Sequence, residues 1–159
     1  MPLEIERKYL VKGDTWRAAA ATRRLLDQGY LSVEPERTVR IRVAEDEAFI
    51  TIKGKKIGAV ALEFEYAIPL ADAEAMLSQL PVMGRIRKYR HEVAHGGRVW
   101  EVDEFLDENE GLVVAELELD DEEDAVDLPE WVGIEVTADH RYFNSSLGMN
   151  PFREWGSTR

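Results

Sequence analysis

Polar and apolar residues alternate along most of this chain, which is the pattern of β-strands that carry one charged face. Successive side chains of a strand point to opposite sides, so residues two apart share a face. In the segment 3–11, Glu4, Glu6 and Lys8 share a face opposite Ile5. The same pattern predicts strands over 30–33, 38–43, 48–53, 60–68, 86–94, 98–105, 112–119 and 131–137.

Helices are expected at a few points between and after these strands. A helix over 14–28 fits Asp14 as its N-cap and would end near Gly29. A second helix fits 70–80, and Asp139 can cap a last helical turn near the C-terminus.

The order of these elements predicts a single domain with an α+β fold. Strands follow one another in hairpin succession, with few helices between them, which favours an antiparallel sheet that closes into a barrel. No linker, repeat or low-complexity tract divides residues 1–159. We therefore expect one closed antiparallel β-barrel with flanking helices.

The composition indicates a globular chain of one ordinary domain. Of its 159 residues, 45% are apolar and 33% charged, and no apolar run is long enough to span a bilayer. The start of the sequence lacks the pattern of a secretory signal, and the chain has no cysteine. These features lead us to expect a cytoplasmic protein without disulfides or thiolate metal sites.

The net charge of −12 excludes some classes of ligand. Nucleic-acid binding requires a broad basic surface that displaces counterions, so we expect no nucleic-acid partner and no membrane partner. A polyanionic ligand would be repelled at long range. Binding such a ligand requires that the basic side chains gather in one place and that cations assist.

The charged faces can be read in two ways. For any one strand, a charged face indicates a sheet with one side in water. The strands considered together differ from such a sheet, because some faces carry almost only carboxylates and others almost only cations. If these faces point inward, the lumen gathers the cations Lys8, Arg40, Arg42, Lys53, Lys88 and Arg90, and the carboxylates Glu4, Glu6, Glu63, Glu65, Asp103, Glu116 and Glu118.

Such a lumen is chemically suited to a metal–polyphosphate complex. Buried charges are costly unless they have partners, so a highly charged lumen implies water and a charged ligand. Guanidinium and ammonium groups bind phosphate oxygens. Carboxylates without His or Cys suit a hard cation such as Mg²⁺ or Mn²⁺.

The motif Glu4-x-Glu6-x-Lys8 and the charged residues after it resemble the CYTH superfamily, the triphosphate tunnel metalloenzymes. The set that follows in order is Arg40-Ile41-Arg42, Lys53, Glu63-Phe64-Glu65, Lys88-Tyr89-Arg90, Asp103 and Glu116-Leu117-Glu118. The resemblance implies an eight-stranded antiparallel tunnel, a divalent metal and a triphosphate substrate. In its short length, with the motif at the start of the sequence, the chain resembles the compact bacterial members of the superfamily. Several of those members hydrolyse inorganic tripolyphosphate.

The resemblance also implies roles for individual residues. Those that hold the triphosphate are Arg40, Arg42, Lys53, Lys88 and Arg90. Those that ligate metal, directly or through water, are Glu4, Glu6, Glu63, Glu65, Asp103, Glu116 and Glu118. Lys8 contacts phosphate or orients the attacking water. Tyr30 is a candidate for proton transfer or a packing residue at the barrel mouth, and Arg141 and Tyr142 either close one tunnel mouth or belong to a surface helix.

The remaining charged and titratable residues in phase with the strands are not assigned to the site. Glu101 and Glu135 are in phase with the lumen faces but can simply neutralise neighbouring lysines. The three histidines, His91, His95 and His140, are interpreted as surface residues.

Several alternatives stay open at this point. Adenylyl cyclases and thiamine triphosphatases of the same superfamily need a pocket for an organic group, and no aromatic cluster beyond Tyr30 lies on the polar faces. The cyclase members carry extra residues before the Glu-x-Glu-x-Lys motif that this chain lacks. A polyphosphate-binding module without catalysis, a structural protein with a hydrated sheet, and a homodimer are the remaining possibilities.

Overall fold

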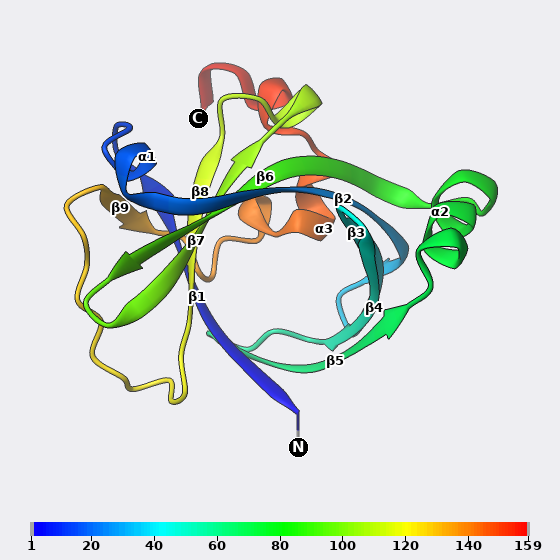
Figure 1. Ribbon diagram of the computed structural model, residues 1–159, viewed down its shortest axis with the longest axis horizontal. Coiled ribbons are helices and arrows are strands. Elements are labelled where there is room, and N and C mark those ends of the chain that lie inside the picture. The colour runs from blue at the N-terminus through cyan, green and yellow to red at the C-terminus, as the bar shows by residue number, and fades with distance from the viewer. Residues whose placement is uncertain (1, 159) are drawn as a thin grey trace.

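The computed structural model describes residues 2–158 and shows an antiparallel sheet that closes on itself (Figure 1). The strands are β1 (Leu3–Val11), β2 (Ala20–Glu34), β3 (Arg37–Ala44), β4 (Glu47–Gly54), β5 (Val60–Ile68), β6 (Met83–His95), β7 (Arg98–Phe105), β8 (Val113–Glu118) and β9 (Val132–Glu135). The helices are α1 (Trp16–Ala19), α2 (Leu70–Gln79) and α3 (Asn144–Leu147), with 3₁₀ turns η1 (Asp107–Asn109), η2 (His140–Tyr142) and η3 (Phe152–Thr158).

The barrel is closed by the pairing of β1 with β5, two strands far apart in sequence. Neighbouring strands follow the order β5-β4-β3-β2-β6-β7-β8-β1, and Glu4 of β1 lies opposite Ala61 of β5. The remaining strand, β9, pairs with the second half of β1. This arrangement confirms the predicted α+β fold with an eight-stranded antiparallel barrel.

The predicted helix over 14–28 is wrong, because only α1 is helical and residues 20–34 form the long strand β2. Leu26, Gln28 and Tyr30 share one face of β2 and are all buried. Backbone pairing with both β3 and β6 along most of β2 outweighs the weak helical preference of this segment. Within residues 2–158, no helix has the length and apolar character needed to cross a bilayer.

The apolar faces of most strands point outward, as expected for a charged lumen. Tyr9, Trp100 and Leu117 form a buried cluster with Trp16 of α1 and Trp131 before β9. The helix α2 covers a second cluster on β3 and β4. The outer face of β5 is less protected, because Phe64 and Tyr66 are 37% and 57% exposed.

One end of the barrel interior is filled by apolar side chains. Phe105 and Val114 lie in register with Lys88 and Asp103 and therefore share the inner face. They belong to a buried cluster with the C-terminal residues Tyr142, Leu147 and Trp155. Capping by Asp139 is confirmed, since its side chain accepts a hydrogen bond from the Arg141 amide at 3.1 Å. The C-terminal segment thus completes the inner wall, and α3 lies within the ring of strands (Figure 1).

Contact between two glycines holds this segment against β6. A Cβ atom added to Gly148 would lie 2.2 Å from the Cα of Gly84. We therefore expect Gly148→Ala to displace α3 and lower the free energy of unfolding by about 1–3 kcal/mol. Thermal unfolding measures this change, with Met149→Ala, an exposed neighbour, as the control. Equal unfolding temperatures for the two variants would contradict this close packing.

Candidate active site

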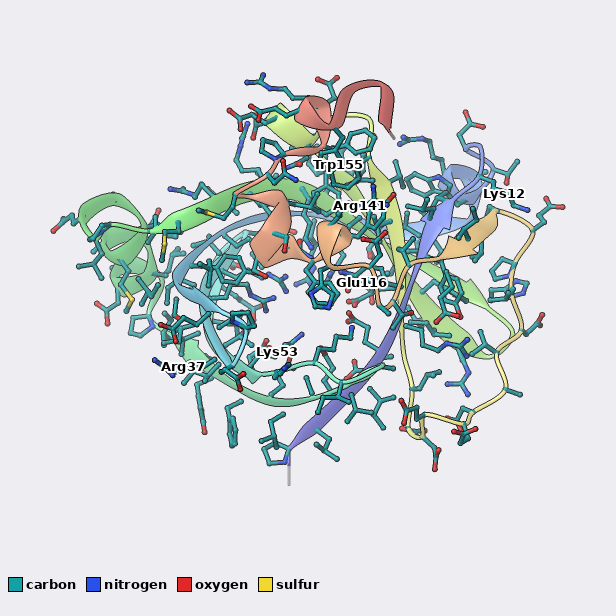
Figure 2. The ribbon with its side chains drawn as sticks, turned by 180° about the vertical axis from the view of Figure 1, so that it is seen from behind. Lys12, Arg37, Lys53, Glu116, Arg141 and Trp155 are labelled. Carbon is teal, nitrogen blue, oxygen red and sulfur yellow. The ribbon has the colours of Figure 1, made fainter. Side chains whose placement is uncertain are left out.

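The charged faces of the strands line one cavity of about 780 Å³ inside the barrel. All the site residues predicted from the sequence line this cavity except Asp103. Figure 2 shows Lys53 and Glu116 within the ring of strands, whereas Lys12 lies outside it. Ten cationic side chains and seven carboxylates line the cavity. A chain with a net charge of −12 therefore has an excess of positive groups in one enclosed place, as binding of a polyanion requires.

At one side of the cavity, β1, β4 and β5 bring carboxylates and cations into contact. The Lys53 Nζ lies 2.6 Å from Glu4 Oε1 and 3.6 Å from Glu63 Oε2. Burial raises the pKa of Glu63 to about 7, and the nearby charge of Glu4 adds to the effect. Arg40 Nη2 lies 3.6 Å from Glu65 Oε2. On this side of the cavity, the two cations Lys53 and Arg40 therefore face three carboxyl groups, those of Glu4, Glu63 and Glu65.

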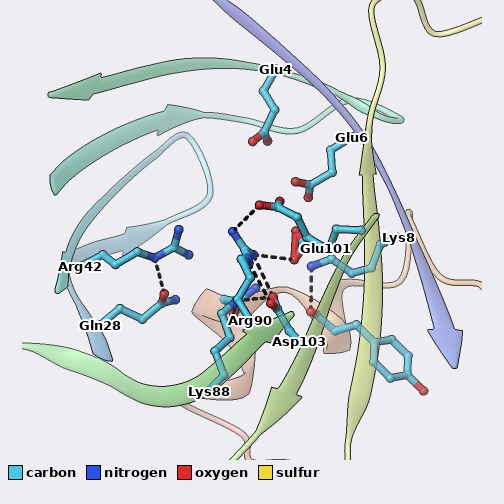
Figure 3. A network of polar contacts seen from close by, with 12 residues as sticks. Glu4, Glu6, Lys8, Gln28, Arg42, Lys88, Arg90, Glu101 and Asp103 are labelled. Carbon is cyan, nitrogen blue, oxygen red and sulfur yellow. Dashed lines mark hydrogen bonds and ion pairs between the residues drawn. The ribbon is translucent and has the colours of Figure 1, made fainter. Parts of the chain in front are cut away.

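At the opposite wall, Asp103 holds two cations in place (Figure 3). Its Oδ1 and Oδ2 accept from Arg90 Nε and Nη2 at 2.8 and 2.9 Å, and Oδ2 also accepts from Lys88 Nζ at 2.7 Å. Burial opposes ionisation of Asp103, but Arg90 and Lys88 outweigh it and lower its pKa. Burial lowers the pKa of Lys88 to about 8. Both oxygens of Asp103 are thus occupied, and its carboxylate does not face the cavity.

Glu6 and Glu116 bring two carboxyl groups together in the lumen. Burial raises the pKa of Glu6 well above its ordinary value, and the charges of Glu116 and Glu4 add to the rise. Burial also disfavours the charge of Glu116, but Lys8, Arg90 and other cations outweigh this and lower its pKa well below the ordinary value. The pair therefore favours one ionised carboxylate, Glu116, beside a Glu6 whose ionisation is disfavoured.

The donor set fits a hard divalent cation. The carboxylates that line the cavity offer only oxygen ligands, and the raised pKa of Glu6 marks a place where added positive charge is favourable. Among residues 2–158, no three acidic or histidine side chains are already close enough to surround a metal ion. Binding of an ion would therefore require that carboxylates rearrange around it or that water completes its ligands.

The C-terminal segment contributes contacts that sequence reasoning missed. The Nζ of Lys8 donates to the backbone oxygen of Tyr142 at 3.1 Å, and the Nζ of Lys88 donates to Asn144 Oδ1 at 2.8 Å. The cations of Lys8 and Lys56 both lie 5.6 Å from the ring of Phe143. Tyr142 was named from the sequence, but Phe143 and Asn144 are neutral residues in a short irregular segment, where strand alternation does not apply.

Several further residues line the cavity. Phe49 follows the same alternation as Thr51 and Lys53, so strand parity could have identified it. Lys55 and Lys56 lie after β4, where the alternation no longer applies. Tyr30 lines the cavity and is 5% exposed.

Glu101, Glu135 and His91 lie in three different environments. Glu101 lines the cavity 3.4 Å from Arg90, whereas Glu135 pairs with Arg7 at 2.8 Å. His91 is not a surface residue, because its ring packs on Trp16 and is 7% exposed. Trp16 at the start of α1 covers this side chain of β6, a contact between distant segments that strand alternation does not predict.

His140 and Arg141 are both exposed, which agrees with the surface interpretation of His140. Both line the cavity, and the ring of His140 stacks on Phe143 at 4.7 Å between centroids. Arg141 pairs with Asp139 at 2.7 Å. The 3₁₀ turn η2 places these side chains at the cavity because Tyr142, between Arg141 and Phe143, is anchored in the apolar cluster.

Comparison with known proteins agrees with this geometry. Residues 2–147 match the CYTH domain. The chain is 44% identical to an inorganic triphosphatase of Acetivibrio thermocellus, over 98% of this chain and 99% of the relative. It is 32% identical to an inorganic triphosphatase of Nitrosomonas europaea, over 92% of this chain and 97% of the relative. A crystal structure of an inorganic triphosphatase superposes with a TM-score of 0.67 at 31% identity, covering 94% of this chain and 96% of the other. The charged barrel and the match along nearly its whole length show that this chain belongs to the CYTH domain family.

Proposed function

We propose that this protein is a metal-dependent triphosphatase whose preferred substrate is inorganic tripolyphosphate. The observation that carries the proposal is the cavity itself, in which ten cations face seven carboxylates inside a strongly acidic chain. The two relatives described as inorganic triphosphatases support the choice of substrate, because each aligns with this chain over more than nine-tenths of its length.

The cations supply the binding of the phosphate groups. We assign this role to Arg40, Arg42, Lys53, Lys88 and Arg90, all of which line the cavity. Guanidinium groups bind phosphate oxygens through paired hydrogen bonds, and lysine acts as a compact positive charge. Together they neutralise the oxygens of the terminal phosphoryl group as it is transferred.

We assign metal binding to the carboxylates that line the cavity, with Mg²⁺ or Mn²⁺ as the ion. These residues are Glu4, Glu6, Glu63, Glu65, Glu116 and Glu118. When bound, the ion polarises phosphoryl oxygens and lowers the pKa of water. We assign Asp103 to holding Lys88 and Arg90, because both of its oxygens are occupied by these two cations.

The reaction is hydrolysis of the terminal phosphoanhydride. The oxygen of an in-line water forms a bond to the terminal phosphorus while the bridging P–O bond breaks, giving orthophosphate and diphosphate. Lys8, with its Nζ held by the Tyr142 carbonyl, orients this water or contacts the phosphate. Tyr30 is our candidate for moving a proton at the cavity wall, where it lies 5% exposed.

Phosphate release from tripolyphosphate, ATP and thiamine triphosphate tests the proposal, each with Mg²⁺, with Mn²⁺ and with a chelator. We expect rapid release from tripolyphosphate that depends on the metal and slower release from the two organic triphosphates. Tight binding of tripolyphosphate without turnover would overturn the proposal in favour of a polyphosphate-binding module.

A further inference from the structure

Arg42 differs from the other cations assigned to the triphosphate. Arg40, Lys53, Lys88 and Arg90 each lie within 4.0 Å of at least one carboxylate oxygen. Arg42 has no such ion pair among the described residues, although it lines the same cavity. Its positive charge is therefore compensated less by the protein than that of its neighbours.

The partner of Arg42 is the neutral side chain of Gln28. The two residues face each other across the β2–β3 pair, and Gln28 Oε1 accepts a hydrogen bond from Arg42 Nε at 2.9 Å (Figure 3). Gln28 is 0% exposed. Among the described residues, Nε is the only nitrogen of Arg42 with a side-chain acceptor, so the two Nη groups keep their donors for another acceptor.

The burial of Gln28 has a cost that packing alone does not explain. Its Nε2 is buried and has no hydrogen-bond partner within residues 2–158. An unsatisfied buried amide is unfavourable, and an apolar side chain of similar length would avoid that cost. The amide is useful at this position because its oxygen can hold a guanidinium without neutralising it, whereas a carboxylate would compete with the phosphate.

We propose that Gln28 is a positioning residue for substrate binding, which orients the guanidinium of Arg42 toward the triphosphate and leaves its charge free. This inference rests on the proposed function. Gln28 acts through Arg42 and does not line the cavity. We therefore expect Gln28 to affect the affinity for the substrate. The groups that take part in the chemical step stay the same when Gln28 is changed.

Two substitutions separate the orientation from the charge. Gln28→Glu keeps the size and the acceptor but pairs Arg42 with a carboxylate, and Gln28→Met removes the acceptor without adding charge. We expect Gln28→Glu to raise KM for tripolyphosphate roughly tenfold to hundredfold, and Gln28→Met to raise it less, about tenfold or below. For both variants kcat stays within about twofold, because lost uniform binding changes KM alone.

A matched control makes the same amide-to-carboxylate change away from the cavity. Asn109 is 4% exposed and accepts a hydrogen bond from the Phe152 amide. Asn109→Asp is expected to leave KM unchanged. Thermal unfolding of each variant shows which proteins are folded, and Gln28→Met carries the test if Gln28→Glu does not fold.

A double-mutant cycle tests whether Gln28 acts through Arg42. In an Arg42→Met background, we expect Gln28→Met, which adds no charge, to change tripolyphosphate affinity by less than about twofold. Isothermal titration calorimetry with tripolyphosphate measures this affinity without requiring turnover. Wild-type affinity in both folded Gln28 variants, or an equal effect of Gln28→Met with and without Arg42, would overturn the inference. A wild-type protein that binds but does not hydrolyse tripolyphosphate overturns only the proposed function.

Discussion

Glu6→Gln is expected to lower metal-dependent hydrolysis of tripolyphosphate by roughly 10²-fold or more, while the metal-free protein stays at least as stable as the wild type. Glu6 is one of the carboxylates that we assign to the metal. Its charged form is disfavoured by burial and by Glu116 and Glu4, so the neutral amide removes an unfavourable charge from the metal-free lumen. Activity should therefore fall in this variant, whereas the stability of the metal-free protein should stay the same or rise.

The pH dependence of stability follows from the direction of this shift. The pKa of Glu6 is raised in the folded protein, so its contribution to stability is present at low pH and is lost as pH rises through the raised value. Glutamine does not ionise, so the Glu6→Gln protein should not lose this stability as pH rises. Thermal unfolding of the metal-free proteins across pH measures the difference.

The control for this prediction is Glu47→Gln, which removes the same charge from an exposed position of β4 outside the cavity. We expect wild-type activity in that variant. A folded Glu6→Gln protein with full activity in the presence of Mg²⁺ or Mn²⁺ would remove Glu6 from the proposed metal site.

Asp103→Ala is expected to have the largest effect on stability, lowering the free energy of unfolding by about 3–5 kcal/mol. The side chains of Asp103 and Lys88 are both 0% exposed, and that of Arg90 is 10% exposed. Removing the carboxylate leaves two buried cations without their nearest counter-charge. Urea unfolding of the purified variant measures the loss.

An exposed ion pair provides the comparison for this variant. Arg153 and Glu108 lie 3.4 Å apart and are 62% and 56% exposed. Because water screens such a pair, Glu108→Ala should cost less than about 1 kcal/mol. Similar losses of stability in the two variants would show that Asp103 does not hold Lys88 and Arg90 as we infer.

Much of the candidate site was predictable because strand alternation is a local property. Glu4, Glu6 and Lys8 had to share a face once their segment was a strand, whatever the rest of the chain did. The same reasoning correctly placed Arg40 and Arg42 on the lumen face of β3. Alternation determines the face of a residue but not its depth, which is why Asp103 was grouped with carboxylates that line the cavity.

The segment 20–28 shows where local patterns fail. Its apolar residues are compatible with both a helix and a strand, and only pairing with β3 and β6 decides between them. The importance of Gln28 and Asn144 was hidden for a related reason. Neutral side chains add nothing to a charge pattern, and their partners Arg42 and Lys88 are distant in sequence.

The sequence by itself determined which residues share a face of each strand and which chemistry those faces carry, since both depend on neighbouring residues alone. The tertiary structure decided that the charged faces point inward, because this depends on the pairing of β1 with β5, which are distant in the chain. It also decided which charges are paired within the wall and which face the cavity, because burial and counter-charges at each position come from several strands at once.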